Sequence, residues 1–111
     1  MKKVKSDLPS RFSSEHVLAA AVAVWPGQLS AVEEISSRAC KIVGAAYEKA
    51  PAFFSGKSEK GILSGLFYRL AFKSVNVKTQ KEIASALHTN ELTIRASSRE
   101  WLEVFPELFP K

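Results

Sequence analysis

A chain of 111 residues with 46% apolar and 24% charged residues is long enough for one folded domain and too apolar for a disordered one. Its one cysteine, Cys40, excludes an internal disulfide and favours a reducing, intracellular setting. The formal net charge of +5 favours a polyanionic partner without requiring one.

The N-terminal segment begins with MKKVK and reaches the apolar run VLAAAVAVW at 17–25, a combination that secretory signal peptides also show. Charged or helix-breaking residues separate the two parts, namely Asp7, Pro9, Arg11, Glu15 and His16. We therefore interpret residues 1–12 as a flexible lead-in and residues 13–111 as a single domain. No stretch reaches the roughly 20 apolar residues of a membrane span.

Five helices are predicted, and no alternating strand pattern competes with them. The first runs from Ser14 as N-cap to Trp25. The second begins at Ser30, which is expected to form a capping box with Glu33, and it ends before Pro51. The fold class predicted from this pattern is all-α.

The third helix is expected from Ser58 to about Lys73, and apolar residues cover most of its circumference. It should therefore be the buried central helix. Gly61 and Gly65 lie four residues apart within it, which would allow the backbone of a neighbouring helix to approach closely.

The last two helices are separated by a short turn. The fourth runs from Thr79 to Leu87, where Thr79 and Glu82 form a second capping box, and the fifth runs from Asn90 as N-cap to about Glu103. This spacing predicts a helix-turn-helix over about 79–103.

Small or apolar residues should turn the inner faces of this unit toward the core: Ile83, Ala84, Leu87, Ile94 and Trp101. Leu92, Arg95 and Arg99 are then left together on the outer side of the fifth helix, at positions i, i+3 and i+7. In a DNA major groove an arginine can pair with guanine, and an apolar tip can contact a thymine methyl group.

Basic residues concentrate around this unit. Residues 57–99 hold eight Lys or Arg against three Glu, while 1–56 carry +2 and 100–111 carry −2. Lys78 and Lys81 flank the fourth helix, and the start of the fifth, from Asn90 to Thr93, can meet a phosphate with its free N–H groups. This distribution favours DNA, although helix-turn-helix corners also occur in proteins that bind none.

The string KTQKEIASALHTNELTIR at 78–95 resembles the end of the second cyclin-like repeat of general transcription factor IIB and its archaeal counterpart. Weaker likeness covers DLPSRF at 7–12 and SGKSEKGILSGLFYRLAFKS at 55–74. FPELFP at 105–110 is more similar to the eukaryotic versions. The resemblance implies a five-helix, cyclin-like domain that ends in a helix-turn-helix.

The resemblance also implies a function, namely binding of double-stranded promoter DNA beside the TATA element together with TATA-binding protein, and indirectly with the RNA polymerase machinery. Leu92 stands where the family has valine, and Arg95 is identical to the family residue. Position and chemistry add Lys78, Gln80, Lys81 and Thr93 as phosphate contacts, beside Asn90. A monomer is expected, in the nucleus of a eukaryote, which is favoured, or in the cytoplasm of an archaeon.

Two departures from the family pattern fall inside the unit. His88 occupies the turn position where the family has glycine, and histidine tolerates a left-handed backbone better than most residues. Ala96-Ser97-Ser98 replaces a polar residue and a tyrosine, with Trp101 expected to compensate for the lost packing.

A second hypothesis is a cyclin-type protein-interaction domain without direct DNA readout. Trp25, Phe53 and Phe54 are expected in the core, but an exposed Phe53-Phe54 pair would mark a protein-binding patch. A third hypothesis, a bacterial-type regulator, would require a dimer and a palindromic site.

No catalytic residue, metal or cofactor is expected. His16 and His88 lack partners at ligand spacing. GKS at 56–58 lacks the first glycine of a phosphate-binding loop, because Pro51 stands there. Cys40 is interpreted as a small buried hydrophobic residue.

Overall fold

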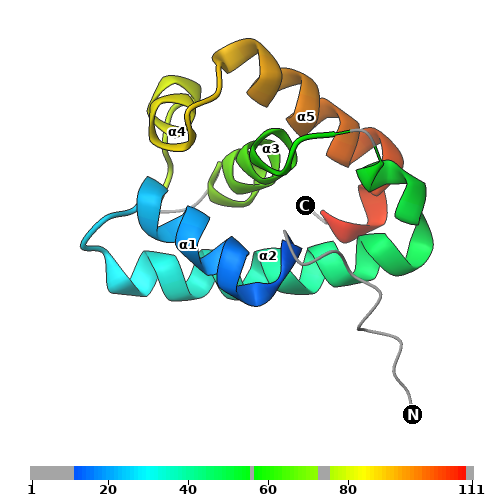
Figure 1. The fold of residues 1–111 in the computed structure, drawn as a ribbon, viewed down its shortest axis with the longest axis horizontal. Helices are drawn as coiled ribbons and strands as arrows, with labels where there is room; N and C mark the ends of the chain where they lie inside the picture. The colour runs from blue at the N-terminus through cyan, green and yellow to red at the C-terminus, as the bar shows by residue number, and fades with distance from the viewer. Residues whose placement is uncertain (1–11, 56, 73–75, 110–111) are drawn as a thin grey trace.

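The computed structural model describes residues 12–55, 57–72 and 76–109 (Figure 1). Within these residues the chain is all-α, with no strand. The elements in chain order are α1 (Ser14–Val24), α2 (Leu29–Lys49), the 3-10 helix η3 (Pro51–Phe54), α3 (Glu59–Ala71), α4 (Gln80–Leu87), α5 (Glu91–Val104) and the 3-10 helix η4 (Pro106–Leu108). The all-α prediction is confirmed, as is the expectation of five α-helices.

Helix α3 forms the centre of the fold. Figure 1 shows α1 and α2 along one side of it and α4 and α5 along the other. Nine of its 13 residues are buried, and its most extensive packing is against α5. The predicted central position of this helix is therefore confirmed, because apolar residues on all sides of a helix require neighbours on all sides.

Two predicted helix starts are wrong. The N-cap of α1 is Ser13, whose hydroxyl accepts from the backbone N–H of His16, and not Ser14. Helix α2 begins at Leu29 with Gln28 in the cap position, so Ser30 lies within the helix and forms no capping box. Helix α2 begins before the predicted position because the preceding turn leads directly into it. In that turn the backbone N–H of Gln28 donates to the Trp25 carbonyl.

An aromatic cluster packs α5 and η4 against η3. The Phe53 ring centroid lies 4.9 Å from that of Trp101 and 5.0 Å from that of Phe105. Phe54 packs edge-on against Phe12 at 5.1 Å. Phe53 and Phe54 are buried, so they are core residues and form no exposed protein-binding patch.

Phe12 is only 1% exposed. It was expected at the end of the flexible lead-in, and it instead packs into the core. The other predicted lead-in residues, 1–11, lie outside the described part of the chain.

Trp25 lies in the core, as the sequence predicted. Its side chain is fully buried, its ring lies 5.8 Å from that of Phe67, and its indole N–H donates to the Asn76 carbonyl over 2.9 Å. A buried indole requires such an acceptor. Among the described residues, no helix combines the length and apolar character needed to cross a membrane.

Gly65 brings α5 close to α3. A methyl group added to Gly65 would lie 2.7 Å from the backbone nitrogen of Ser98, well inside contact distance. The predicted close approach is therefore confirmed at this glycine. Ser97 and Ser98 meet Gly65 directly, so the small residues at 96–98 are matched to a glycine on the facing helix.

Candidate nucleic-acid interface

Helix α4 begins at a firmly held N-terminus. The Thr79 hydroxyl accepts from the backbone N–H of Glu82 over 3.0 Å, and the Glu82 carboxylate accepts from the backbone N–H of Thr79 over 2.8 Å. This reciprocal pair is the predicted capping box, which satisfies two free N–H groups of the helix start. The Thr79 backbone hydrogen bond, aided by the positive charge of Lys78, lowers the pKa of Glu82.

A tight turn joins α4 to α5. His88 adopts the left-handed conformation, with φ 58° and ψ 45°, as the sequence predicted for this position. The backbone N–H of Thr89 donates to the Ala84 carbonyl over 2.9 Å, and the Asn90 side chain accepts from the N–H of Thr93 over 2.8 Å. The direction of α5 relative to α4 is therefore fixed by caps on both sides of the turn.

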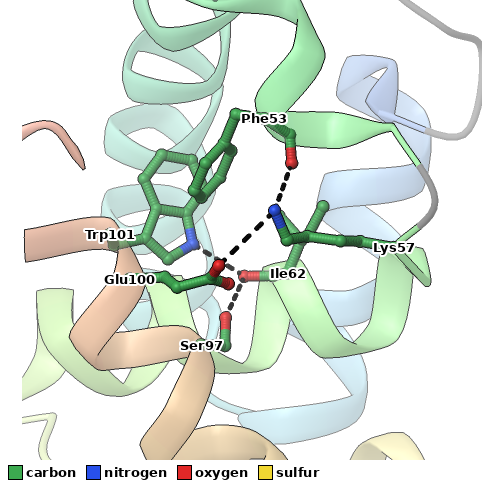
Figure 2. Close-up of polar contacts among 6 residues, drawn as sticks. All are labelled: Phe53, Lys57, Ile62, Ser97, Glu100 and Trp101. Atoms are coloured by element: carbon green, nitrogen blue, oxygen red, sulfur yellow. Dashed lines mark hydrogen bonds and ion pairs between the residues drawn. The ribbon is translucent and has the colours of Figure 1, made fainter. Parts of the chain in front are cut away.

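The inner side of α5, made up of Ile94, Ser98 and Trp101, is buried. The Trp101 indole N–H donates to the Ile62 carbonyl over 3.0 Å, and the Ser97 hydroxyl reaches the same carbonyl over 3.5 Å (Figure 2). Ile94 is fully buried between the helices. These contacts set the rotation of α5 about its own axis.

Lys57 and Arg69 strengthen the same helix contact. The Lys57 ammonium donates to the Phe53 carbonyl over 2.7 Å and pairs with Glu100 of α5 at 3.6 Å (Figure 2). Arg69 donates to the Ser98 hydroxyl over 3.1 Å. Two of the basic residues counted in the 57–99 segment thus bind other parts of the fold, and they add less to an external positive surface than the sequence alone indicates.

The outer side of α5, made up of Leu92, Arg95 and Arg99, faces solvent. Leu92 is 70% exposed, and both arginines are exposed. The Arg95 Nη1 donates to the side-chain oxygen of Gln80 over 3.0 Å. This bond connects the outer side of α5 to the first turn of α4.

Three of the five predicted phosphate contacts gather at the start of α4. Lys78, Gln80 and Lys81 line a shallow depression of about 470 Å³. Its other lining residues are Tyr68, Phe72, Val77, Thr79, Glu82 and Glu91. Two negative charges, those of Glu82 and Glu91, therefore lie beside the two lysines in this depression.

The other two predicted phosphate contacts are placed differently. Thr93 lines a second hollow of about 260 Å³ together with Lys57, Gly61 and Glu100, away from the depression at the start of α4. The Asn90 side-chain oxygen is used as the cap of α5. The structure therefore does not bring all five residues into one group.

Sequence reasoning missed the hydrogen bond between Arg95 and Gln80 and the ion pair between Lys57 and Glu100. The first joins residues 15 positions apart on different helices. Helical periodicity relates only residues on the same helix, so no signal in the sequence could have revealed either pair.

Among the described residues, neither the cysteine nor a cluster of metal-ligand side chains offers a second site. Cys40 is half-buried, and burial raises the pKa of its thiol, which disfavours the nucleophilic thiolate. No group of three or more His, Cys, Asp or Glu in the described ranges is placed to hold a metal ion. The α4–α5 unit therefore remains the candidate site.

Comparison with known proteins identifies the class. Over 79 residues the chain is 32% identical to transcription initiation factor IIB of Haloarcula vallismortis, a match that covers 71% of this chain and 68% of the relative. No protein-family model matches the chain, and no solved structure matches it at a significant level. The similarity places the chain among transcription initiation proteins. It belongs to the transcription initiation factor IIB family.

Membership of the transcription initiation factor IIB family, which the sequence resemblance predicted, is thereby confirmed. The relative comes from an archaeon, so the comparison gives no support to the eukaryotic, nuclear setting that FPELFP at 105–110 favoured. An archaeal, cytoplasmic setting is consistent with the same relative.

Proposed function

We propose that this protein is a DNA-binding module of a general transcription initiation factor, a single cyclin-like repeat that reads promoter DNA next to the TATA element. In this proposal α4, the turn and α5 act as a helix-turn-helix, with α5 as the recognition helix. Leu92, Arg95 and Arg99 contact base edges. TATA-binding protein is the companion on the same DNA, and the polymerase machinery is reached indirectly.

The observation that carries the proposal is the contrast on α5 between a locked inner side and an exposed outer side. A recognition helix must keep one orientation while its outer side chains enter a groove. Leu92 offers an apolar tip for a thymine methyl group, and Arg95 and Arg99 offer donors for guanine. An exposed leucine by itself would need no explanation. The proposed function explains why Leu92 is exposed beside two arginines on a helix of fixed orientation.

Phosphate contacts would position the module without selecting sequence. Lys78 and Lys81 at the start of α4 are suited to this, since they lie on either side of Gln80, whose side chain binds Arg95. Thr93 and Asn90 are weaker candidates, because one lines the second hollow and the other caps α5. Single modules bury about 600–1,000 Å² on DNA, so we expect weak binding alone and tighter binding with TATA-binding protein.

The test is a salt series of fluorescence-anisotropy titrations with a TATA-flanking duplex and with duplexes substituted upstream of the TATA element. Arg95→Ala should reduce discrimination among these duplexes by about 5- to 100-fold at the contacted base pair. Lys81→Ala should lower affinity for all of them about equally and reduce the salt dependence. Binding that is unaffected by salt would contradict the proposal, because phosphate contacts release counterions.

A second candidate function is a cyclin-type protein-interaction domain. The observation that favours it is the apolar surface near the start of the chain, where Leu18 and Val22 of α1 are 45% and 48% exposed and Leu29 is 71% exposed. The two functions are separated by the same titrations. A protein-interaction domain would show no duplex binding that depends on Arg95.

A further inference from the structure

Gln80, one of the predicted phosphate contacts, has a side-chain partner within the protein. It is the first residue of α4, and its side-chain oxygen accepts a hydrogen bond from Arg95 Nη1 over 3.0 Å. The bond crosses from one helix of the unit to the other. Its oxygen is therefore directed to the proposed base-reading arginine.

We infer that Gln80 is a positioning residue that holds the Arg95 guanidinium in the orientation required for base readout. The inference rests on the proposed function and deepens it, because it assigns Gln80 to sequence discrimination and removes it from the phosphate contacts. An exposed arginine samples many rotamers, and each side chain that becomes ordered only on binding lowers the affinity of the complex. A partner that orders the arginine before binding removes part of that cost.

The backbone is fixed at both ends of this hydrogen bond, which we call the Gln80–Arg95 tether. Gln80 directly follows Thr79, whose capping box with Glu82 fixes the first turn of α4. At the other end, Arg95 follows Ile94, which is fully buried. The backbone of Gln80 is thus fixed by a cap, and that of Arg95 by core packing. A hydrogen bond between the two side chains therefore restricts the motion of the guanidinium.

The chemistry of glutamine suits this role. A carboxylate at the same position would also bind Arg95, but it would neutralise the charge that attracts DNA and would repel the phosphates. The neutral amide oxygen accepts the bond and leaves the positive charge of Arg95 in place. Gln80 uses only Nη1, and the parallel N–H groups of the Nε–Nη2 edge match the O6 and N7 acceptors of guanine.

The first experiment tests the tether in the free protein. Nuclear relaxation of the Arg95 Nε–H group is measured in the wild type, in Gln80→Met, which keeps the length of the side chain without the acceptor, and in Gln80→Glu, which restores an acceptor. The wild type and Gln80→Glu should show an ordered Arg95, and Gln80→Met a mobile one. Equal order in the wild type and Gln80→Met would overturn the inference.

The second experiment tests the consequence for readout. Binding of a duplex library randomised over one helical turn beside a TATA element is measured for the wild type, Arg95→Ala, Gln80→Met and Lys81→Met. Arg95→Ala identifies the base pair that Arg95 reads. Gln80→Met should lose about 2- to 10-fold of the preference at that same base pair, the factor that corresponds to ordering one long side chain. Affinity for duplexes without the preferred base should stay unchanged.

Lys81→Met is the matched control, since it should weaken binding to all duplexes without changing the preferred base. If Gln80→Met behaves like Lys81→Met, Gln80 is a phosphate contact and the inference is wrong, while the proposed function stands. If the wild type binds no duplex in a salt-dependent manner, the proposed function fails, and the inference fails with it. The two failures are thus distinguished by the wild type alone.

Discussion

The two sides of α5 are held in opposite ways. On the inner side, polar groups of α3 form hydrogen bonds with the indole of Trp101 and the hydroxyls of Ser97 and Ser98. Gly65 allows the two helices to approach closely there. On the outer side, Arg95 donates a side-chain hydrogen bond to Gln80, while Leu92 and Arg99 extend into solvent. Because the contacts that fix the helix lie on its inner side, the outer residues remain exposed to a partner.

The contrast predicts its largest effect at Trp101. Trp101→Ala removes a fully buried indole and leaves the Ile62 carbonyl without that donor, so the free energy of unfolding should fall by about 3–5 kcal/mol. Leu92→Ala is the matched control on the other side and should change it by less than about 0.5 kcal/mol. Chemical denaturation measures both. A large loss of stability in Leu92→Ala would show that the outer side also supports the fold.

The close approach of the helices predicts the next effect. Gly65→Ala should lower the free energy of unfolding by about 1–3 kcal/mol, because the new methyl group would overlap the backbone of Ser98. Gly44→Ala in α2 is the control, since a methyl group there meets nothing within 4 Å. That change should stabilise the protein by up to about 1 kcal/mol through helix propensity. Stabilisation by both substitutions would contradict the described packing.

The turn between α4 and α5 predicts a gain. His88 has φ 58°, a conformation that is strained for residues with a side chain, so His88→Gly should raise the free energy of unfolding by about 1 kcal/mol. Thr89→Gly serves as the control, because Thr89 has no positive φ and should lose stability on substitution. Thermal unfolding of the two variants measures the difference. A destabilised His88→Gly would mean that the imidazole contributes contacts that outweigh the strain.

The smallest effect concerns pH. The pKa of Glu82 is lowered in the folded state, so its stabilising contribution is present above the ordinary glutamate range and is lost as pH falls through the lowered pKa. Glu82→Gln keeps a side-chain oxygen for the Thr79 N–H but does not titrate. Its thermal midpoint should therefore fall less than that of the wild type on acidification. Parallel pH profiles of the two proteins would contradict this assignment.

Much of the fold was readable from the sequence because local rules govern it. The capping residues Thr79, Glu82 and Asn90 act within one helical turn, and the apolar pattern of α3 reports its burial directly. The predicted capping box at Ser30 was wrong because such a pattern shows only which hydrogen bonds a side chain can form. The preceding turn at Trp25 and Gln28 decided where α2 begins.

The candidate site was readable only in part. The exposure of Leu92, Arg95 and Arg99 follows from the periodicity of one helix once Ile94 and Trp101 point inward. The partners of Gln80, Lys57 and Arg69 lie on other helices, and their pairing depends on how the helices pack in three dimensions. Charge counted along the sequence therefore overstated the basic surface, since Lys57 and Arg69 bind groups of α5 and η3.

Amide chemical-shift mapping with a TATA-flanking duplex at low salt, with and without TATA-binding protein, tests the central claim most directly. The account predicts that the largest shifts fall within residues 78–99, at the start of α4 and on the outer side of α5, and that TATA-binding protein increases them. Shifts confined to α1 around Leu18 and Val22, or none within 78–99, would contradict it.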